Sequence, residues 1–382
     1  MIRYCKNCLF PETKPHLSFD EKGICNACTN YRDRPEINWI QRKKEFLSIL
    51  DRYRSKSNSW DCIVPVSGGK DSTYQVLTML EYGMTPLCVN SRTCDLSEIG
   101  RRNIENIKRL GVDFIEMSPN PGIRSKLNRI GLTQIGDISW PDHIGMFTFP
   151  FRLAVQMNIP LIVYGENSQH EYGGPADAVS RHFQDKRWLE EFGGMQGLRL
   201  TDVVGIDKIK PNDLNIYTFP SHDEMVKNDV VAIYLGHFLP WNGLNNYLLS
   251  QAHGFESYGK AVEGGFVDYE NLDNHQNGIH EYLKYLKYGY GRATDQASIL
   301  IRRGLLTRCQ ALPIVTKQDG RFPWTYLGKE IEKILEPLNM SIEEFQKICD
   351  QFTSKKLFLQ DAKGNLIKDA RGNLTKTNYD NT

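Results

Sequence analysis

The sequence predicts an α/β protein built on a doubly wound parallel sheet, with a small N-terminal metal-binding module and a helical C-terminal region. Three observations predict this fold. Short apolar runs alternate with helical patterns between residues 60 and 164, which is typical of a parallel sheet with helical crossovers. The first of these runs ends in a turn at Gly68 and Gly69 that leads directly into a helical pattern. Two C-x-x-C pairs lie within the first 28 residues.

The expected elements follow one another along the chain, and Gly83 and Gly111 mark the ends of two helices. Strands are expected at 60–66, 85–90, 113–117, 160–164 and 229–235, and helices at 36–54, 73–82, 97–110, 122–132, 143–157, 177–192, 242–253, 277–288, 323–339 and 341–352. We therefore expect four parts: a zinc-binding module (1–35), the sheet domain (36–220), a mainly helical substrate or partner region (221–356) and a tail (357–382).

Length and composition set limits on the function. A chain of 382 residues is long enough for roughly two domains. The net charge is +1, which provides no overall attraction to nucleic acid or to an anionic membrane. No apolar run reaches about 18 residues, and the N-terminus has no apolar signal segment, so neither a transmembrane helix nor secretion is expected. Nine cysteines in a chain of this length are typical of the reducing cytoplasm.

The two C-x-x-C pairs are formed by Cys5 with Cys8 and by Cys25 with Cys28, and 16 residues separate them. This spacing is typical of a tetrahedral zinc site with four thiolates. Because four thiolates leave no position for water, the expected zinc is structural. The alternatives are redox-active pairs or four unlinked thiols. Among the other cysteines, Cys94 follows a predicted strand end and is the one candidate nucleophile.

A phosphate-binding loop is expected at residues 67–72. A strand, a short loop and a helix N-terminus suit a phosphate, since the first N–H groups of a helix are unpaired and carry partial positive charge. Glycine allows the backbone to approach the ligand. Lys70 adds a mobile charge, and Asp71 can hold Mg²⁺. The residues expected to bind the phosphates are Ser67, Gly68, Gly69, Lys70, Asp71 and Ser72.

Further candidate residues follow from the sheet topology, because ligands bind at the carboxyl ends of parallel strands. Asn90 ends the second predicted strand, and Gly165, Glu166 and Asn167 follow the fourth. Asn90 and Gly165 are expected to contact the nucleotide, and Asn167 the substrate. Glu166 is expected to bind a second metal, position the substrate or orient ammonia. A turn or helix cap is the structural alternative for residues 165–167.

Residues 274–295 are dense in His, Lys, Arg and Tyr. Lys284, Lys287 and Arg292 are candidates for contacts with phosphates or with a sugar acid. The structural alternative is a solvated basic helix whose aromatic residues pack inward.

The run Ser67-Gly68-Gly69-Lys70-Asp71-Ser72 resembles the PP-loop, S-G-G-x-D-S, of the ATP pyrophosphatase superfamily. The resemblance implies the doubly wound sheet of that superfamily. It also implies cleavage of ATP between the α and β phosphates and transfer of AMP to a carbonyl-type oxygen, which a nitrogen or sulfur nucleophile then displaces. Lys70, Asp71 and Glu166 are the residues expected to take part in catalysis.

Together with the cysteine quartet and residues 164–167, the run at 286–295 resembles the N-acetyl sugar amidotransferases of bacterial surface-polysaccharide and nonulosonic acid biosynthesis. The resemblance covers almost the whole chain. It implies an acetamido sugar as substrate, either nucleotide-linked or a nonulosonic acid, and an acetamidino sugar as product. The implied cofactors are structural Zn²⁺, Mg²⁺ and ATP as co-substrate. The implied partners are subunits resembling a glutaminase and a cyclase, which supply ammonia.

Two other functions stay open. A PP-loop tRNA thiolase also pairs an N-terminal zinc module with this loop, but the near-neutral charge and the single cysteine quartet argue against it. In a thiolase, Cys94 would be the only candidate thiol. A non-catalytic zinc- and nucleotide-binding module is the third hypothesis, and the intact loop at 67–72 argues against a degenerate site.

Overall fold

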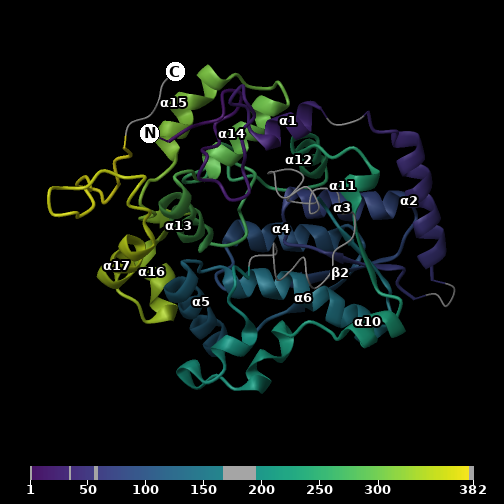
Figure 1. Ribbon diagram of the computed structural model, residues 1–382. Helices are drawn as coiled ribbons and strands as arrows, with labels where there is room; N and C mark the ends of the chain where they lie inside the picture. Colours follow the sequence, from purple (N-terminus) through teal and green to yellow (C-terminus); the bar gives the residue numbers. More distant parts are fainter. Residues whose placement is uncertain (1, 34–35, 56–58, 167–194, 378–382) are drawn as a thin grey trace.

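The computed structural model describes residues 2–33, 36–55, 59–166 and 195–377, and a five-stranded parallel sheet lies at its centre (Figure 1). The strand order is β3-β2-β1-β4-β5, so the winding direction reverses between β1 and β4. This order confirms the predicted doubly wound sheet and makes the β1–β4 boundary the expected ligand position. The strands are β1 (Cys62–Pro65), β2 (Pro86–Ser91), β3 (Asp113–Met117), β4 (Leu161–Tyr164) and β5 (Val231–Tyr234).

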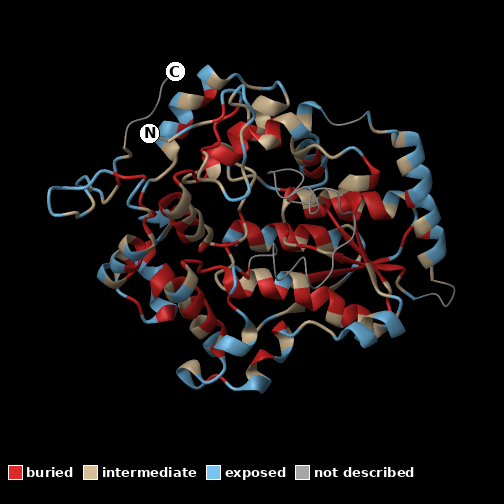
Figure 2. Cartoon of the chain, viewed as in Figure 1, coloured by how far each residue is buried: buried red, intermediate tan, exposed pale blue. Residues whose placement is uncertain are grey.

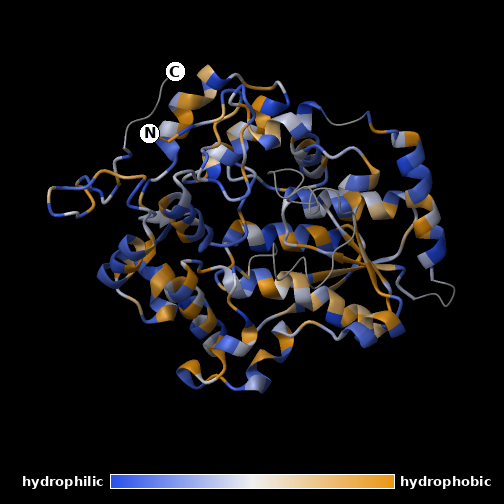
Figure 3. Ribbon diagram, viewed as in Figure 1, coloured by the Kyte–Doolittle hydropathy of each residue, from blue (hydrophilic) through white to orange (hydrophobic). Residues whose placement is uncertain are grey.

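Alternate side chains of the strands fill two separate cores, one on each face of the sheet. Cys62 and Val64 of β1 pack with residues of α2 (Trp39–Tyr53), α3 (Lys70–Glu81) and α4 (Glu98–Arg109). Ile63 packs with residues of α6 (Trp140–Met157). Both faces are therefore covered by helices, which explains why the strands are continuous apolar runs. Figures 2 and 3 show the strands as mostly hydrophobic and, apart from the partly exposed edge strand β3, as mostly buried.

Helices α2 to α6 lie close to their predicted positions, with one functional difference, whereas α10 and α11 were not predicted. The helix after β1 begins at Lys70, three residues before the predicted start, because Gly69 is its N-cap. Lys70, Asp71 and Ser72 therefore occupy the first helical turn. The helix predicted at 177–192 lies outside the described residues. The helices are α2 (Trp39–Tyr53), α3 (Lys70–Glu81), α4 (Glu98–Arg109), α5 (Pro121–Ile135), α6 (Trp140–Met157), α10 (His222–Lys227) and α11 (Leu235–Phe238), with 3-10 turns η1 (Leu200–Val203), η2 (Ile206–Lys208) and η3 (Pro211–Tyr217).

The C-terminal region is mainly helical, as predicted, although one predicted helix is partly wrong. The segment 323–339 begins with a two-stranded hairpin, because Leu327 and Gly328 both adopt positive φ and turn the chain back. The helices α14 and α15 had no counterpart in the sequence prediction. The elements are α12 (Gly243–Ala252), α13 (Asn277–Tyr288), α14 (Arg292–Arg302), α15 (Arg308–Gln318), β6 (Thr325–Tyr326), β7 (Lys329–Glu330), α16 (Ile331–Leu335), η4 (Glu336–Leu338) and α17 (Ile342–Phe352).

The sheet domain and the C-terminal region share part of one apolar core. Leu132 and Ile138 of the sheet domain share one core with Leu283 and Phe345 of the C-terminal region. The tail beyond α17 folds back on itself through isolated β-bridges. No helix in the described ranges combines the length and the apolar character needed to cross a membrane.

The N-terminal module, which includes α1 (Asn26–Arg32), packs against the C-terminal region (Figure 1). Leu9 lies in a small core with Ala293 and Ala297 of α14. The rings of Phe10 and Tyr290 meet edge to face with centroids 5.7 Å apart. The first and last thirds of the chain are therefore joined across the fold.

A close approach of α5 to its own C-terminal loop makes a prediction about stability. A Cβ atom on Gly131 would lie 2.5 Å from the Asp137 carbonyl oxygen and 2.8 Å from the Trp140 Cβ. We expect Gly131→Ala to lower the free energy of unfolding by about 1–3 kcal/mol because the backbone must move. Gly122→Ala, on the same helix, would meet only an ordinary contact at 3.5 Å. Equal midpoints for the two variants in urea denaturation would contradict the prediction.

Candidate functional site

A cavity of about 470 Å³ opens at the carboxyl end of the sheet, at the point where the strand order reverses. The loop after β1, the ends of β2 and β4, one face of α6 and the segment 269–277 form its walls. The sheet domain and the C-terminal region therefore both contribute to it. Pockets at such boundaries are common binding sites in α/β proteins.

The loop at 67–72 forms the floor of this cavity. Gly68 has φ +88°, and a Cβ there would lie 2.9 Å from the Ile104 side chain of α4, so this position requires glycine. The Gly69 N–H donates a hydrogen bond to Ser67 Oγ at 3.3 Å. Within the described part of the chain, no side chain caps α3, so the first N–H groups of this helix have no capping partner there. These features make the loop suitable for an anion.

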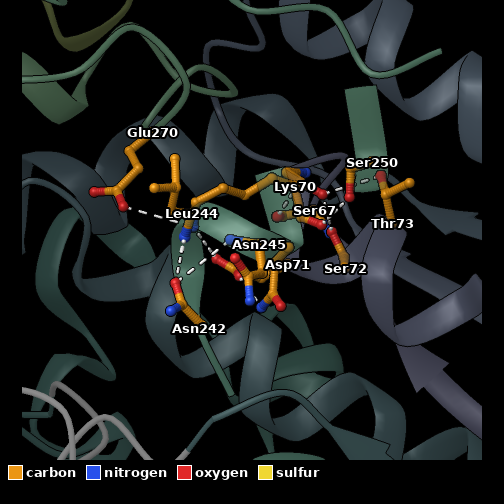
Figure 4. A network of polar contacts seen from close by, with 12 residues as sticks. Ser67, Lys70, Asp71, Ser72, Thr73, Asn242, Leu244, Asn245, Ser250 and Glu270 are labelled. Carbon is orange, nitrogen blue, oxygen red and sulfur yellow. Dashed lines mark hydrogen bonds and ion pairs between the residues drawn. The ribbon is translucent and has the colours of Figure 1, made fainter. Parts of the chain in front are cut away.

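The Lys70 side chain is buried among carboxylates (Figure 4). Its ammonium contacts Asp71 and lies 3.5 Å from Glu270 Oε1. Burial disfavours the charged form, but Asp71 and Glu270 raise the pKa of Lys70 above its ordinary value, and Glu166 adds to this effect. Lys70 therefore stays charged, and Asp71, Glu166 and Glu270 bring three carboxylates near one point.

Glu270 is a site residue that sequence reasoning missed. It accepts hydrogen bonds of 2.7 Å from Arg292 Nη2 and from Gln296 Nε2. Burial would raise the pKa of Glu270, but Arg292 and Lys70 lower it to about 2. Glu270 therefore stays ionised and connects the loop lysine to α14. Its segment has no periodic pattern or motif in the sequence, so only the fold reveals it.

Helix α12 is hydrogen-bonded to the phosphate-binding loop, and sequence reasoning missed this contact as well. Asn246 Nδ2 donates to Asp71 Oδ1 at 2.9 Å, and Ser250 Oγ donates to the Lys70 carbonyl oxygen at 2.7 Å. The two residues are four positions apart and lie on one face of the helix. They therefore orient the first turn of α3 (Figure 4, which labels Ser250).

The ends of β2 and β4 place the remaining predicted residues at the cavity. Asn90 Nδ2 donates to the Val66 carbonyl oxygen at 2.6 Å, which secures the start of the loop. A Cβ on Gly165 would lie 2.9 Å from the Trp241 ring. Glu166 lines the cavity. Asn167 lies outside the described residues.

Of the three basic residues predicted between 284 and 292, the structure brings only Arg292 to the cavity. Lys284 contacts Glu281 and lies 2.6 Å from Asp295. Lys287 donates to the Ile135 carbonyl oxygen at 3.3 Å. Lys284 is therefore paired inside the C-terminal region, and Lys287 bridges to α5. Their predicted contacts with phosphate or sugar have no support in this geometry.

The face of α6 that lines the cavity includes polar residues that sequence reasoning did not single out. Ser139, Asp142 and His143 border it, together with the apolar Met146 and Phe147. Asp142 is ion-paired with the buried Arg124 of α5. This wall therefore offers hydroxyl and imidazole groups beside apolar surface.

The cysteine quartet forms a compact cluster away from the cavity. The ligand atoms of Cys5, Cys8, Cys25 and Cys28 all lie within 4.8 Å of one another, and all four residues are buried. Cys5 Sγ lies 3.9 Å from Cys28 Sγ, and Cys8 Sγ lies 3.7 Å from Cys25 Sγ. A tetrahedron with Zn–S bonds of about 2.3 Å has edges of about 3.8 Å. The cluster therefore fits a structural zinc ion.

Other groups around the cluster favour thiolates. The Cys8 and Cys25 N–H groups donate to Cys5 Sγ at 3.4 and 3.2 Å. Arg308 Nη1 donates to the Cys5 and Cys8 carbonyl oxygens. These contacts tie the metal-binding turn to α15.

Cys94 lies beside the cavity but does not line it, whereas Thr93 does. Burial raises the pKa of the Cys94 thiol. A raised thiol pKa disfavours a nucleophilic thiolate.

Comparisons with known proteins find similarity to parts of the chain. Residues 253–371 match the protein family described as LPS biosynthesis protein WbpG-like, C-terminal domain. An uncharacterized protein of Methanocaldococcus jannaschii is 31% identical over 104 residues, which are 27% of this chain and 36% of that protein. The chain thus spans about a third of the length of this curated relative.

Among solved structures, the chain is similar to NMN synthetase from Francisella tularensis, with a TM-score of 0.27 and 12% identity. The similarity covers 51% of this chain and 92% of that chain. The fold assignment rests on the strand order and on the helices that cover both faces of the sheet.

The zinc cluster makes a prediction that does not depend on activity. We expect the purified protein to contain about one zinc per chain by elemental analysis, and Cys8→Ser to lose it. Because the module packs on α14, Cys8→Ser should also lower the melting temperature. Cys309→Ser is the matched control, since Cys309 is exposed and lies outside the cluster. Full zinc content in Cys8→Ser would contradict the assignment.

Proposed function

We propose that this protein is an ATP-dependent amidotransferase that adenylates the acetamido oxygen of an N-acetyl sugar and replaces that oxygen with ammonia. The sugar is nucleotide-linked or a nonulosonic acid, and the product is an acetamidino sugar. One observation carries the proposal: the Ser-Gly-Gly-Lys-Asp-Ser loop begins α3 at a cavity closed by residues 269–277, which belong to the segment matched to an LPS biosynthesis domain.

The phosphate-binding features fit the β and γ phosphates of ATP. The N-terminus of α3 and the Lys70 ammonium provide positive charge at one point. Asp71, Glu166 and Glu270 are the oxygen donors that would hold Mg²⁺. Bound there, Mg²⁺ would neutralise charge on the phosphates. The protein contributes mainly positioning and fixed charge, as is usual for transfers at phosphorus.

The proposed reaction has two steps. The acetamido oxygen attacks the α-phosphorus of ATP, a P–O bond to the β-phosphate breaks, and pyrophosphate leaves. Ammonia then adds to the imidate carbon, and the C–O bond to AMP breaks. Activation is needed because an amide oxygen is a poor leaving group, whereas AMP is a good one. The acceptor would occupy the side of the cavity formed by α6, where hydroxyls and apolar side chains suit a sugar.

The ammonia would come from separate subunits that resemble a glutaminase and a cyclase. This part rests on the resemblance of the chain to the N-acetyl sugar amidotransferases. Glutamine hydrolysis by the purified chain alone would contradict it.

The tRNA thiolase hypothesis has less support. Its only candidate thiol, Cys94, is set back from the cavity and has a raised pKa. We expect Cys94→Ala to leave ATP-dependent activity on acetamido sugars intact.

The deciding experiment supplies ATP, Mg²⁺ and ammonium chloride with a panel of acceptors: UDP-linked acetamido uronic acids, acetamido nonulosonic acids and unmodified tRNA. AMP and pyrophosphate should form together only with an acetamido sugar. The product mass should fall by about 1 Da, because NH replaces O. Turnover of tRNA alone would reject the proposal, and so would ATP cleavage that yields ADP.

Asp71 makes a separate prediction for metal dependence. Asp71→Asn keeps the shape of the side chain and the hydrogen bond from Asn246, but it removes a charge that would hold Mg²⁺ and that pairs with Lys70. We expect kcat to fall about 100-fold and the Mg²⁺ concentration for half-maximal rate to rise. Asp229→Asn, at an exposed ion pair with Arg52, is the control. An unchanged Mg²⁺ requirement in Asp71→Asn would exclude this role for Asp71.

A further inference from the structure

Two histidines share one buried carboxylate beside the cavity. Asp137 lies in the connection between α5 and α6 and is only 1% exposed. His280 Nδ1, on α13, lies 2.7 Å from Asp137 Oδ1, and His143 Nδ1, on α6, lies 3.9 Å from Asp137 Oδ2. The two imidazole rings meet edge to face with centroids 5.3 Å apart. The sheet domain and the C-terminal region thus meet at this cluster.

Asp137 is held in place by further hydrogen bonds. The Ser139 N–H donates to Asp137 Oδ1 at 2.9 Å, and Gln196 Nε2 donates to Oδ2 at 2.7 Å. Burial opposes ionisation, but His280 lowers the pKa of Asp137 well below its ordinary value. The same contact raises the pKa of His280 against the effect of burial. Asp137 and His280 therefore form an ion pair behind the cavity wall.

His143 is the member of this cluster that faces the cavity. It lines the cavity, and its side chain is 27% exposed. Its Nδ1 is buried and has no hydrogen-bond partner among the described residues, so the accessible part of the ring is the edge that carries Nε2. The cavity wall thus presents an imidazole nitrogen that neither the phosphate-binding loop nor the proposed Mg²⁺ ligands use.

The charged groups around His143 decide its protonation. Asp137 and Glu281 favour the imidazolium, whereas burial and the positive His280 disfavour it. Burial dominates, and the pKa of His143 lies below its ordinary value. A neutral imidazole near pH 7 can accept a proton.

We propose that His143 is the proton acceptor of amidotransfer, and that Asp137 and His280 are positioning residues that hold its ring at the cavity wall. The inference rests on the proposed function. When ammonia forms a C–N bond with the carbon of the N-protonated imidate, the π pair of the existing C=N bond moves to the sugar nitrogen, and the incoming nitrogen carries a positive charge. An N–H bond then breaks, the proton moves to His143 Nε2, and the released electron pair forms C=N while the C–O bond to AMP breaks.

The test compares pH profiles of kcat/KM for the full chain, with ATP, Mg²⁺, ammonium chloride and the acetamido sugar that wild type turns over best. With the concentration of free NH3 held constant, the rate of wild type should fall as the pH drops through the pKa of His143, which burial places below its ordinary value. His143→Gln should lose about 100-fold in kcat and should lose this acid limb. His222→Gln is the control, since His222 is exposed on α10 and distant from the cluster in sequence.

A second variant tests the cluster itself. His280→Gln removes a positive charge that lowers the pKa of His143 and frees Asp137 to raise it. The acid limb should therefore move to higher pH. A merely structural role for the cluster would lower activity at every pH and leave the limb in place.

Chemical rescue separates catalysis from folding. Imidazole added to His143→Ala should restore part of the lost rate, whereas a misfolded variant would not respond. The inference is overturned if His143→Gln keeps the acid limb. It is also overturned if imidazole gives no rescue in a His143→Ala variant that melts like wild type. In both cases, turnover by wild type would still support the proposed function. If wild type forms no AMP with any acetamido sugar, both are rejected.

Discussion

The site depends on the ion pairs that the buried Lys70 ammonium makes with two carboxylates. The ammonium is held by Asp71 from its own helix and by Glu270 from the C-terminal region. Removing either partner would leave a buried charge uncompensated, which is far more costly than losing a surface ion pair. The position of the phosphate-binding loop is therefore coupled to the docking of the C-terminal region.

This coupling extends through α14 to the N-terminal module. Arg292, the first residue of α14, pairs with Glu270, and the next residue, Ala293, packs with Leu9 beside the cysteine cluster. The zinc-binding module thus lies at one end of a chain of contacts that ends at Lys70. A structural metal can contribute to the site in this way without touching a substrate.

Both the sheet domain and the C-terminal region contribute polar and charged side chains to the cavity. The sheet domain provides the phosphate-binding loop and the α6 wall, and the C-terminal region provides Glu270, Arg292 and the His280 side chain behind His143. Placing charged groups at such a boundary keeps them out of bulk water, where their interactions would be weaker. It also explains why the segment matched to an LPS biosynthesis domain cannot form the site alone.

The sequence by itself determined the features that depend on residues close together in the chain. A strand, a Gly-Gly turn and a helix start within a few residues, so the loop at 67–72 and the doubly wound sheet were predictable, as was the cysteine quartet from its spacing. A local sequence pattern does not show what a charged side chain contacts. Lys284 and Lys287 stand out by their charge, yet Lys284 is paired inside the C-terminal region and Lys287 bridges to α5. Only the tertiary structure decided that Glu270, Asn246 and Ser250 meet the loop and that Asp137 joins two histidines. Apart from His143, which lies close to Asp137 in the sequence, the partners are more than 100 positions away. Such contacts leave no periodicity or motif that a single sequence can reveal.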